Sequence, residues 1–312
     1  MLFRSGIEVY AWMIYLCNSG VDSLHKQHPE YYQVLRPGEA ARLGEPSPNP
    51  DRGYGLRAPC LCPDRGLLPY EKKLTQELLR TYDVAGIAAD YVGYRNFTAC
   101  YCDVSNRQRL AYAKKYGIPV PLRRQFALHA FSEASLIRWF AELRAAVNEV
   151  RPNAKIAMHM YPHYAPNPDV AARFDVDYCG RTIAWLFKPF WSYGKIDATA
   201  RACAAADAKL DPPAGPTGEL PPPTGAAAEA AQKEWPHRPA PPARRTFVPF
   251  IGVEQRKLLK APERLRQEIR IAGAHGGGRI MIAFAKVFRN HPELARVVAE
   301  ELNGDGFEPA DE

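Results

Sequence analysis

Acidic, histidine and aromatic residues stand at the ends of several strand-like segments of the chain. Asp90 and Tyr91 close one segment, His159 and Tyr161 close another, and Glu254 follows a third. In a parallel barrel the carboxyl ends of the strands share one face, and that face carries the site. Two carboxylates can cleave a glycosidic bond, because one donates a proton while the other attacks or activates water. The pattern therefore predicts that Asp90 and Glu254 are catalytic carboxylates.

Other residues near the same strand ends are expected to bind the substrate. Aromatic rings stack on flat ligand faces such as sugar rings, and the chain contains 16 Tyr and 5 Trp. A Tyr-rich core is the alternative reading of that composition. The expected substrate-binding residues are Trp12, Tyr91, Arg95, His159, Tyr161 and Trp185. The same predicted edge also carries Tyr15, His163, Arg181 and Lys286.

Each carboxylate also has a purely structural interpretation. Asp90 could cap a helix or pair with Arg95, and Glu254 could be a surface acid paired with Arg256 or Lys257. His159 could be a packed residue at a strand end rather than a partner of sugar hydroxyls. These alternatives stay open at the level of sequence.

The elements that would position these residues alternate between strands and helices. Strand-like runs are expected at 7–15, 84–91, 155–161, 176–186, 247–253 and 279–284. Helices are expected at 70–82, 105–116, 132–150, 262–273 and 292–302, the third beginning at a Ser132 cap. This alternation predicts a parallel sheet with right-handed crossovers. A doubly wound sheet is the rival, but no glycine-rich phosphate loop follows the first strand.

The predicted fold class is α/β, a (β/α)8 TIM-type barrel. Six strands are expected where a closed barrel needs eight, which suggests that the first two strands are missing. The whole chain, 1–312, is expected to form a single barrel domain. Residues 211–245 are rich in Pro and Ala and predict a disordered insertion, because they cannot bury enough apolar surface. Residues 303–312 predict a flexible acidic tail, and 24–64 a long loop.

Charge and hydropathy exclude some classes of partner. The formal net charge is +7, but the basic residues are scattered and no nucleic-acid-binding motif accompanies them. No run reaches 18 apolar residues, so no membrane span is expected. The first residues do not form a signal peptide, and the compartment is left open.

Several runs of the chain resemble one family. The run YDVAGIAADYVGYRN (82–96) resembles the signature Y-x-V-D-G-I-x-x-D-Y-x-R-Y of hypothetical glycosyl hydrolases with a TIM-barrel fold. GIEVYAWMIY (6–15) resembles the third strand of that family, and PCLCPDRG (59–66) resembles the turn that leads to its fourth strand. DVDYCGRTI (175–183) is similar to its sixth-strand region.

The resemblance spans roughly residues 6 to 190 and implies that strands one and two are absent. It also implies that Asp90, at the end of the family's fourth strand, is the catalytic carboxylate. Ala85 and Gly93 depart from the Asp and the Arg of the signature, so the resemblance carries no substrate contact over to these two positions. The resemblance does not fix the second carboxylate, so Glu254 depends on its place after a strand.

Four cysteines lie in two C-x-C pairs, Cys60 with Cys62 and Cys100 with Cys102. The run CYCDVSNRQ (100–108) resembles a C-Y-C-x-x-C cluster that holds a structural zinc in some barrel galactosidases, with Ser105 in place of the third cysteine. Four thiolates from two loops could hold zinc in a tetrahedral site. A disulfide or free buried thiols are the alternatives.

The sequence thus favours a glycoside hydrolase-like enzyme with a carbohydrate substrate. A catalytically inactive carbohydrate-binding barrel is the first alternative. A metal-dependent hydrolase using His159, His163 and Asp90 is the second. No cofactor is required for hydrolysis by paired carboxylates. The sugar, the linkage, the stereochemical outcome and the oligomeric state stay open.

Overall fold

The computed structural model describes most of the elements that the sequence predicts. The described residues are 9–16, 28–36, 39–40, 61–94, 100–118, 126–160, 173–184, 190–207, 247–255, 258–283 and 285–303. The predicted insertion at 211–245 and the predicted tail after Asn303 lie outside them.

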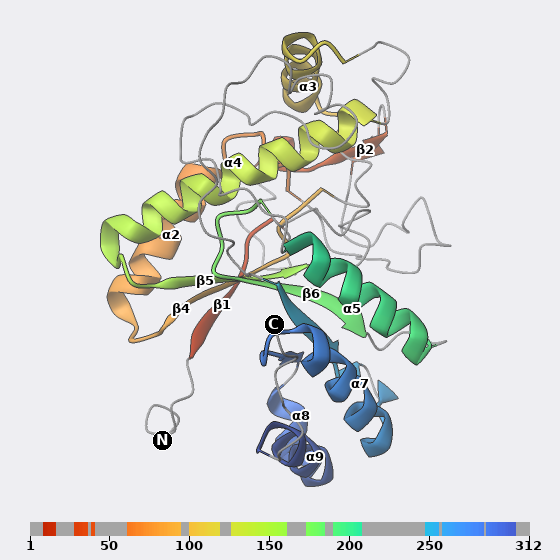
Figure 1. The fold of residues 1–312 in the computed structure, drawn as a ribbon. Coiled ribbons are helices and arrows are strands. Elements are labelled where there is room, and N and C mark those ends of the chain that lie inside the picture. Colours follow the sequence, from red (N-terminus) through yellow and green to blue (C-terminus); the bar gives the residue numbers. More distant parts are fainter. Residues whose placement is uncertain are drawn as a thin grey trace, which may run out of the picture.

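The centre of the fold is a six-stranded parallel sheet in the order β1-β4-β5-β6-β7-β10. Its strands are β1 (Tyr10–Ile14), β4 (Gly86–Asp90), β5 (Lys155–Met160), β6 (Tyr178–Ala184), β7 (Phe247–Gly252) and β10 (Met281–Ala283). All six predicted strands are confirmed. Because consecutive strands are neighbours and parallel, each connection crosses over the same side of the sheet. The result is an α/β half-barrel (Figure 1).

Helices pack along one side of this half-barrel, except for the helix at Asp103–Lys115, which packs on another helix away from the sheet. They are α2 (Leu68–Thr81), α3 (Asp103–Lys115), α4 (Phe126–Val150), α5 (Tyr193–Asp207), α7 (Pro262–His275), α8 (Ala285–Asn290) and α9 (Pro292–Asn303). α2 packs on α4, whereas α7 packs between α5 and α9 (Figure 1). Two small antiparallel pairs, β2 (Val34–Arg36) with β3 (Glu39–Ala40) and β8 (Glu254–Gln255) with β9 (Leu258–Leu259), and a 3-10 turn at Pro29–Tyr31 lie in the connections.

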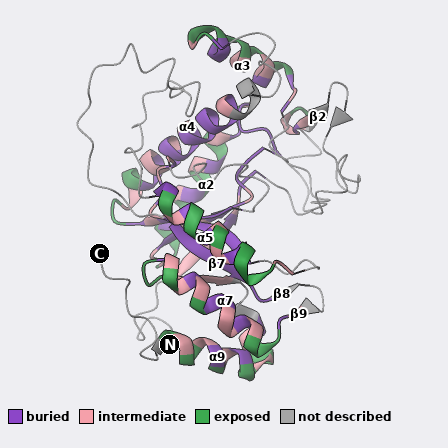
Figure 2. Ribbon diagram, turned by 45° about the vertical axis from the view of Figure 1, so that its right-hand side comes forward, coloured by how far each residue is buried: buried purple, intermediate pink, exposed green. Residues whose placement is uncertain are grey.

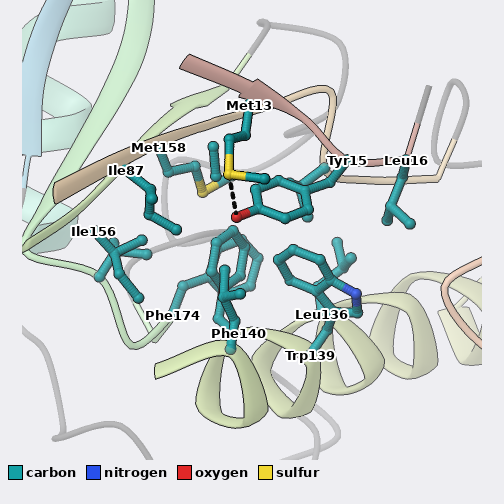
Figure 3. Close-up of a cluster of buried hydrophobic side chains, with 14 of the residues drawn as sticks. Met13, Tyr15, Leu16, Ile87, Leu136, Trp139, Phe140, Ile156, Met158 and Phe174 are labelled. Atoms are coloured by element: carbon teal, nitrogen blue, oxygen red, sulfur yellow. Dashed lines mark hydrogen bonds between the residues drawn. The ribbon is translucent and has the colours of Figure 1, made fainter. Parts of the chain in front are cut away.

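The first hydrophobic core fills the space between β1, β4 and β5 and the helices α2 and α4. Figure 3 shows part of it, with side chains from the strands facing Leu136, Trp139 and Phe140 of α4. Tyr15 packs edge-on against Trp139, with 5.1 Å between the ring centroids, and its hydroxyl bonds Thr75 Oγ1 at 2.8 Å. The buried Tyr15 hydroxyl is therefore satisfied inside the core.

A second core lies between β6 and β7 and the helices α5, α7 and α9. Its buried residues include Ile183, Ile196, Ile251, Leu265 and Leu294. Figure 2 shows the same pattern, with buried residues on the strands and exposed residues on the outward faces of the helices. The two cores together give the sheet a helix-covered face along its whole width.

The predicted start of one helix is wrong. α4 begins at Phe126 rather than at a Ser132 cap, and Ser132 is fully buried within the helix. Ser135, one turn further along the helix, donates its hydroxyl to Asp64 Oδ1 at 2.6 Å. A serine that caps a helix and a serine buried inside a helix look alike in sequence. The buried partner Asp64, which comes from a distant segment, shows that Ser135 is of the second kind. The helices α5 and α8 were not predicted at all.

The described helices contain no segment that is both long enough and apolar enough to span a membrane.

Candidate functional site

Asp90 lies at the carboxyl end of β4 and accepts three hydrogen bonds. Its Oδ1 accepts from the backbone N–H of Tyr91 at 2.8 Å and lies 3.2 Å from Nδ1 of His159. Its Oδ2 accepts from the indole N–H of Trp12 at 3.0 Å. The Asp90 carboxylate is thus joined to β1 and to β5. It caps no described helix, and Arg95, its alternative partner, lies outside the described residues.

Trp12 contributes both a donor and an exposed ring to this site. The residue is 59% exposed, although its indole nitrogen bonds to the buried Asp90. Successive side chains of a strand point to opposite faces, so Trp12 and Tyr15 cannot share a face of the sheet. Tyr15 therefore belongs to the core and not to the site edge where the sequence analysis placed it. Trp12 keeps the face of the sheet that bears Asp90.

Tyr91 follows Asp90 in a left-handed backbone conformation with a φ of 57°. This conformation is uncommon for residues other than glycine and costs roughly 1–2 kcal/mol. It turns the chain sharply where β4 ends and allows the Tyr91 N–H to bond the carboxylate of Asp90. Such strain is often found at functional sites. The predicted substrate-binding Tyr91 therefore lies directly beside Asp90.

His159 is buried on β5 with both ring nitrogens engaged. Nδ1 faces Asp90, and Nε2 lies 2.9 Å from Oγ1 of Thr182 on β6. The imidazole also stacks on the ring of Phe250 from β7, with 3.8 Å between the centroids. A metal ion would have to displace one of these partners to bind His159. His163, the other proposed histidine ligand, lies outside the described residues.

Glu254 begins the small hairpin formed by β8 and β9, directly after β7. Lys260 closes this hairpin, because its backbone N–H donates to the carbonyl of Val253 at 3.2 Å. The Lys260 ammonium donates to the carbonyl of Ala184 at 3.3 Å and to Glu268 at 2.5 Å. The Glu254 backbone is therefore anchored beside the carboxyl end of β6. Its side chain lies outside the described residues, as do the residues Arg95, Tyr161 and Trp185.

Three thiols gather in a second, separate cluster. Cys62, Cys100 and Cys102 are buried, and their Sγ atoms all lie within 4.8 Å of one another. The Sγ atoms of Cys62 and Cys102 are 3.7 Å apart. Zinc bound to sulfur at about 2.3 Å in a tetrahedron would place two sulfurs about 3.8 Å apart. The three thiols therefore fit a zinc ion, and Cys60, the fourth predicted ligand, lies outside the described residues.

Polar groups surround the thiol cluster. The hydroxyl of Ser105 lies 3.2 Å from the Sγ atoms of both Cys62 and Cys102 and donates to Asp64 at 2.6 Å. The backbone N–H of Ser105 donates to Cys102 Sγ at 3.3 Å, which caps the first turn of α3. Asp64 also accepts hydrogen bonds from Tyr94 and Ser135. Buried polar partners of this kind orient the side chains that coordinate a metal ion.

Hydrogen bonds within the cluster concentrate negative charge on one sulfur. Bonds from the thiols of Cys100 and Cys62 lower the pKa of Cys102, and Arg65 acts in the same direction. The bonds with Cys100 and then Cys102 raise the pKa of Cys62, and the bond with Cys102 raises that of Cys100 to about 11. The five described cysteines are free thiols, so the alternative of a disulfide is not found among them.

Two residues of the Asp90 site were not identified from the sequence. Thr182 and Phe250 are register partners on β6 and β7, and both contact His159. Their signal in the sequence is weak, because a threonine and a phenylalanine are ordinary strand residues. The period-two alternation of β6, which places Thr182 on one face with Gly180, could have indicated Thr182.

The fold is similar to solved structures of glycoside hydrolases. The glycoside hydrolase domain of PgaB (BpsB) from Bordetella bronchiseptica gives a TM-score of 0.56 at 15% identity, over 96% of this chain and 76% of that chain. Alpha-L-fucosidase isoenzyme 2 from Paenibacillus thiaminolyticus gives a TM-score of 0.53 at 16% identity, over 96% of this chain and 38% of the fucosidase chain. The beta-galactosidase from Bacillus circulans sp. alkalophilus gives a TM-score of 0.54 at 14% identity, over 90% of this chain and 43% of that chain.

This chain therefore has a glycoside hydrolase-like α/β fold, a half-barrel in its described part. It spans less than half the length of the fucosidase and of the galactosidase. No protein-family model matches the chain, and no curated protein matches it in sequence.

Proposed function

We propose that this protein is a glycoside hydrolase-like enzyme that cleaves a carbohydrate with Asp90 as one catalytic carboxylate. The observation that carries the proposal is the place of Asp90, at the carboxyl end of β4 and bonded to the exposed Trp12. In barrels of this type the carboxyl ends of the strands bear the site. The neighbouring indole offers an accessible ring face for a sugar.

Glu254 is the proposed second carboxylate. It follows β7, three strands along from β4 in the sheet, and its hairpin is held by the buried Lys260. With Asp90 as nucleophile or base, Glu254 would donate the proton to the leaving group. Retaining enzymes separate the two carboxyl groups by about 5 Å and inverting enzymes by about 6.5 to 9.5 Å, so the outcome depends on that separation. Arg95, Tyr161 and Trp185 complete the proposed substrate contacts.

The test is hydrolysis of aryl glycosides and polysaccharides by the purified chain and by Asp90→Asn. We expect the substitution to lower kcat by roughly 10³-fold, because the amide cannot attack or take up a proton. Asp83→Asn is the matched control, since Asp83 is exposed and lies before the opposite end of β4. Equal activity of the two variants would contradict a catalytic role for Asp90.

A carbohydrate-binding barrel without catalysis is the second candidate. It is favoured by the exposed Trp12, which can bind a sugar whether or not the Asp90 carboxylate is used. Calorimetric binding of an oligosaccharide, lost in Trp12→Ala but unaccompanied by any hydrolysis, would identify it. A metal-dependent hydrolase is less well supported, because both nitrogens of His159 already have protein partners.

The protein is also proposed to hold a structural zinc on Cys62, Cys100 and Cys102, with Cys60 as the fourth ligand. Bound zinc would supply a crosslink between the loop before α2 and the start of α3. Metal analysis of the purified protein should find one zinc per chain and much less in Cys102→Ser. Cys203→Ser removes a buried thiol of α5 outside the cluster and serves as the control. Zinc-free wild-type protein would refute this assignment.

A further inference from the structure

The two oxygens of the Asp90 carboxylate are held unequally. Oδ1 is shared by the Tyr91 N–H and His159 Nδ1, at 2.8 and 3.2 Å. Among the described residues, Oδ2 accepts one hydrogen bond, from Trp12 Nε1. A carboxylate oxygen has two lone-pair sites, so Oδ1 is filled while Oδ2 keeps one site for another partner. Asp90 is buried, and Oδ2 lies on the side of its carboxylate that faces the largely exposed Trp12.

His159 is itself held on three sides. Because the carboxylate of Asp90 accepts, Nδ1 of His159 carries a proton, and in the neutral ring Nε2 accepts from the hydroxyl of Thr182. Phe250 stacks on the imidazole with an interplanar angle of 18°. A flip of the ring would break both hydrogen bonds at once. The imidazole therefore has one orientation, set by β6 and β7.

The strand register explains why these side chains meet. His159 is paired with Gly180 on β6, and Thr182 is paired with Phe250 on β7. Gly180 has no side chain, and a Cβ there would lie only 2.7 Å from the sulfur of Met281. The side chain of Met281 therefore occupies the space over Gly180, and the imidazole bonds to Thr182, two residues further along the same face of β6. Asp90, His159 and Thr182 thus form a row across β4, β5 and β6.

We propose that His159 is a positioning residue that holds Oδ1 of Asp90, so that Oδ2 is the oxygen presented to the substrate. The hydroxyl of Thr182 fixes the tautomer of His159 for this purpose. The inference rests on the proposed role of Asp90 and deepens it by naming the reacting oxygen. It gives His159 a different task from the sugar contact that the sequence suggested, since both ring nitrogens are used within the protein.

The indole N–H of Trp12 reports the orientation of Asp90 without any substrate. In a ¹⁵N-labelled protein its resonance is assigned by its loss in Trp12→Phe. In His159→Asn the amide nitrogen takes the place of Nδ1, so the donor to Asp90 is kept. In His159→Gln the amide reaches the place of Nε2, and the donor to Asp90 is lost. We expect the Trp12 resonance to stay in place in the first variant and to shift upfield in the second.

A shift of equal size in both variants, or none in either, would show that His159 only packs in the sheet. Thr182→Val and Thr182→Ser give an independent pair, because valine keeps the shape of threonine and serine keeps its hydroxyl. The Trp12 resonance should shift in the valine variant and remain in the serine variant. The reverse result would overturn the role of Thr182. Circular dichroism on all four variants confirms that each is folded.

Turnover provides the second readout. For any glycoside that the wild-type protein hydrolyses, His159→Gln should lower kcat by about 10² and leave KM within about twofold, since misplacing a reacting group by about 1 Å has this effect. His159→Asn should recover most of that loss. If the wild-type protein hydrolyses no glycoside, the proposed function fails, while the Trp12 resonance still decides whether His159 positions Asp90.

Discussion

Glu71 is a buried carboxyl group whose ionisation opposes folding. It lies on α2, is 3% exposed and accepts one hydrogen bond, from the indole N–H of Trp139 at 3.3 Å. Its Oε1 is buried with no hydrogen-bond partner among the described residues. Burial raises the pKa of Glu71 from 4.5 to about 8, and the bond from Trp139 offsets only part of this shift. The Glu71 carboxyl is therefore protonated in the folded protein at neutral pH.

The magnitude follows from linkage between proton binding and folding. Between pH 4.5 and 8 the folded state binds one proton more than the unfolded state at this group, so its contribution to the unfolding free energy falls by about 1.4 kcal/mol per pH unit. The contribution of the protonated Glu71 carboxyl to the unfolding free energy is complete below pH 4.5 and is lost as the pH rises toward 8. At pH 7 the loss is about 3 kcal/mol by this reasoning. Glu71→Gln removes the titration and keeps an acceptor for Trp139.

The assay is urea unfolding of wild type and Glu71→Gln at several pH values from 4.5 to 8, followed by tryptophan fluorescence. We expect nearly equal unfolding free energies at pH 4.5 and a variant that is more stable by about 3 kcal/mol at pH 7. Glu77→Gln on the exposed face of the same helix should show no such trend. A difference between Glu71→Gln and wild type that stays constant across this range would refute the reasoning.

Three further outcomes are expected. Lys260→Met should lower the unfolding free energy by up to about 3 kcal/mol, because it removes the buried ammonium paired with Glu268 and leaves that carboxylate with Arg264 alone. The double variant Lys260→Met with Glu268→Leu should recover most of this loss in denaturant melts. Tyr91→Gly should have an unfolding free energy about 1 kcal/mol higher than that of Tyr91→Ala in denaturant melts, because only alanine keeps the Cβ strain of the left-handed backbone. The opposite order of stability would contradict the positive φ of Tyr91. Glu254→Gln should lower kcat more for glycosides with poor leaving groups than for activated aryl glycosides, as loss of a general acid requires, and equal losses for both would exclude this role.

The alternation of strands and helices could be predicted because each of these elements follows from a local pattern of apolar residues. The β-branched and aromatic runs mark all six strands of the sheet. The helical spacing of Leu74, Leu78 and Tyr82 predicts the helix α2 but not its buried face, because Leu74 and Tyr82 are exposed and α2 buries Glu71, Thr75 and Leu79 instead. The start of α4 and the whole of α5 were missed. The helix α4 is largely buried and apolar on most sides, and α5 is rich in alanine. Neither helix therefore has a clear periodic apolar stripe or a capping residue that identifies its end.

The sequence by itself determined the parallel α/β architecture and the residue type at the end of each strand, including Asp90, because strand ends follow from local hydrophobic runs. Only the tertiary structure decided which of these residues meet. It joined His159 on β5 to Thr182 and Phe250 from two further strands. It likewise gathered Cys62 with Cys100 and Cys102. Contacts between distant segments depend on register and on side-chain direction, and no local pattern encodes either.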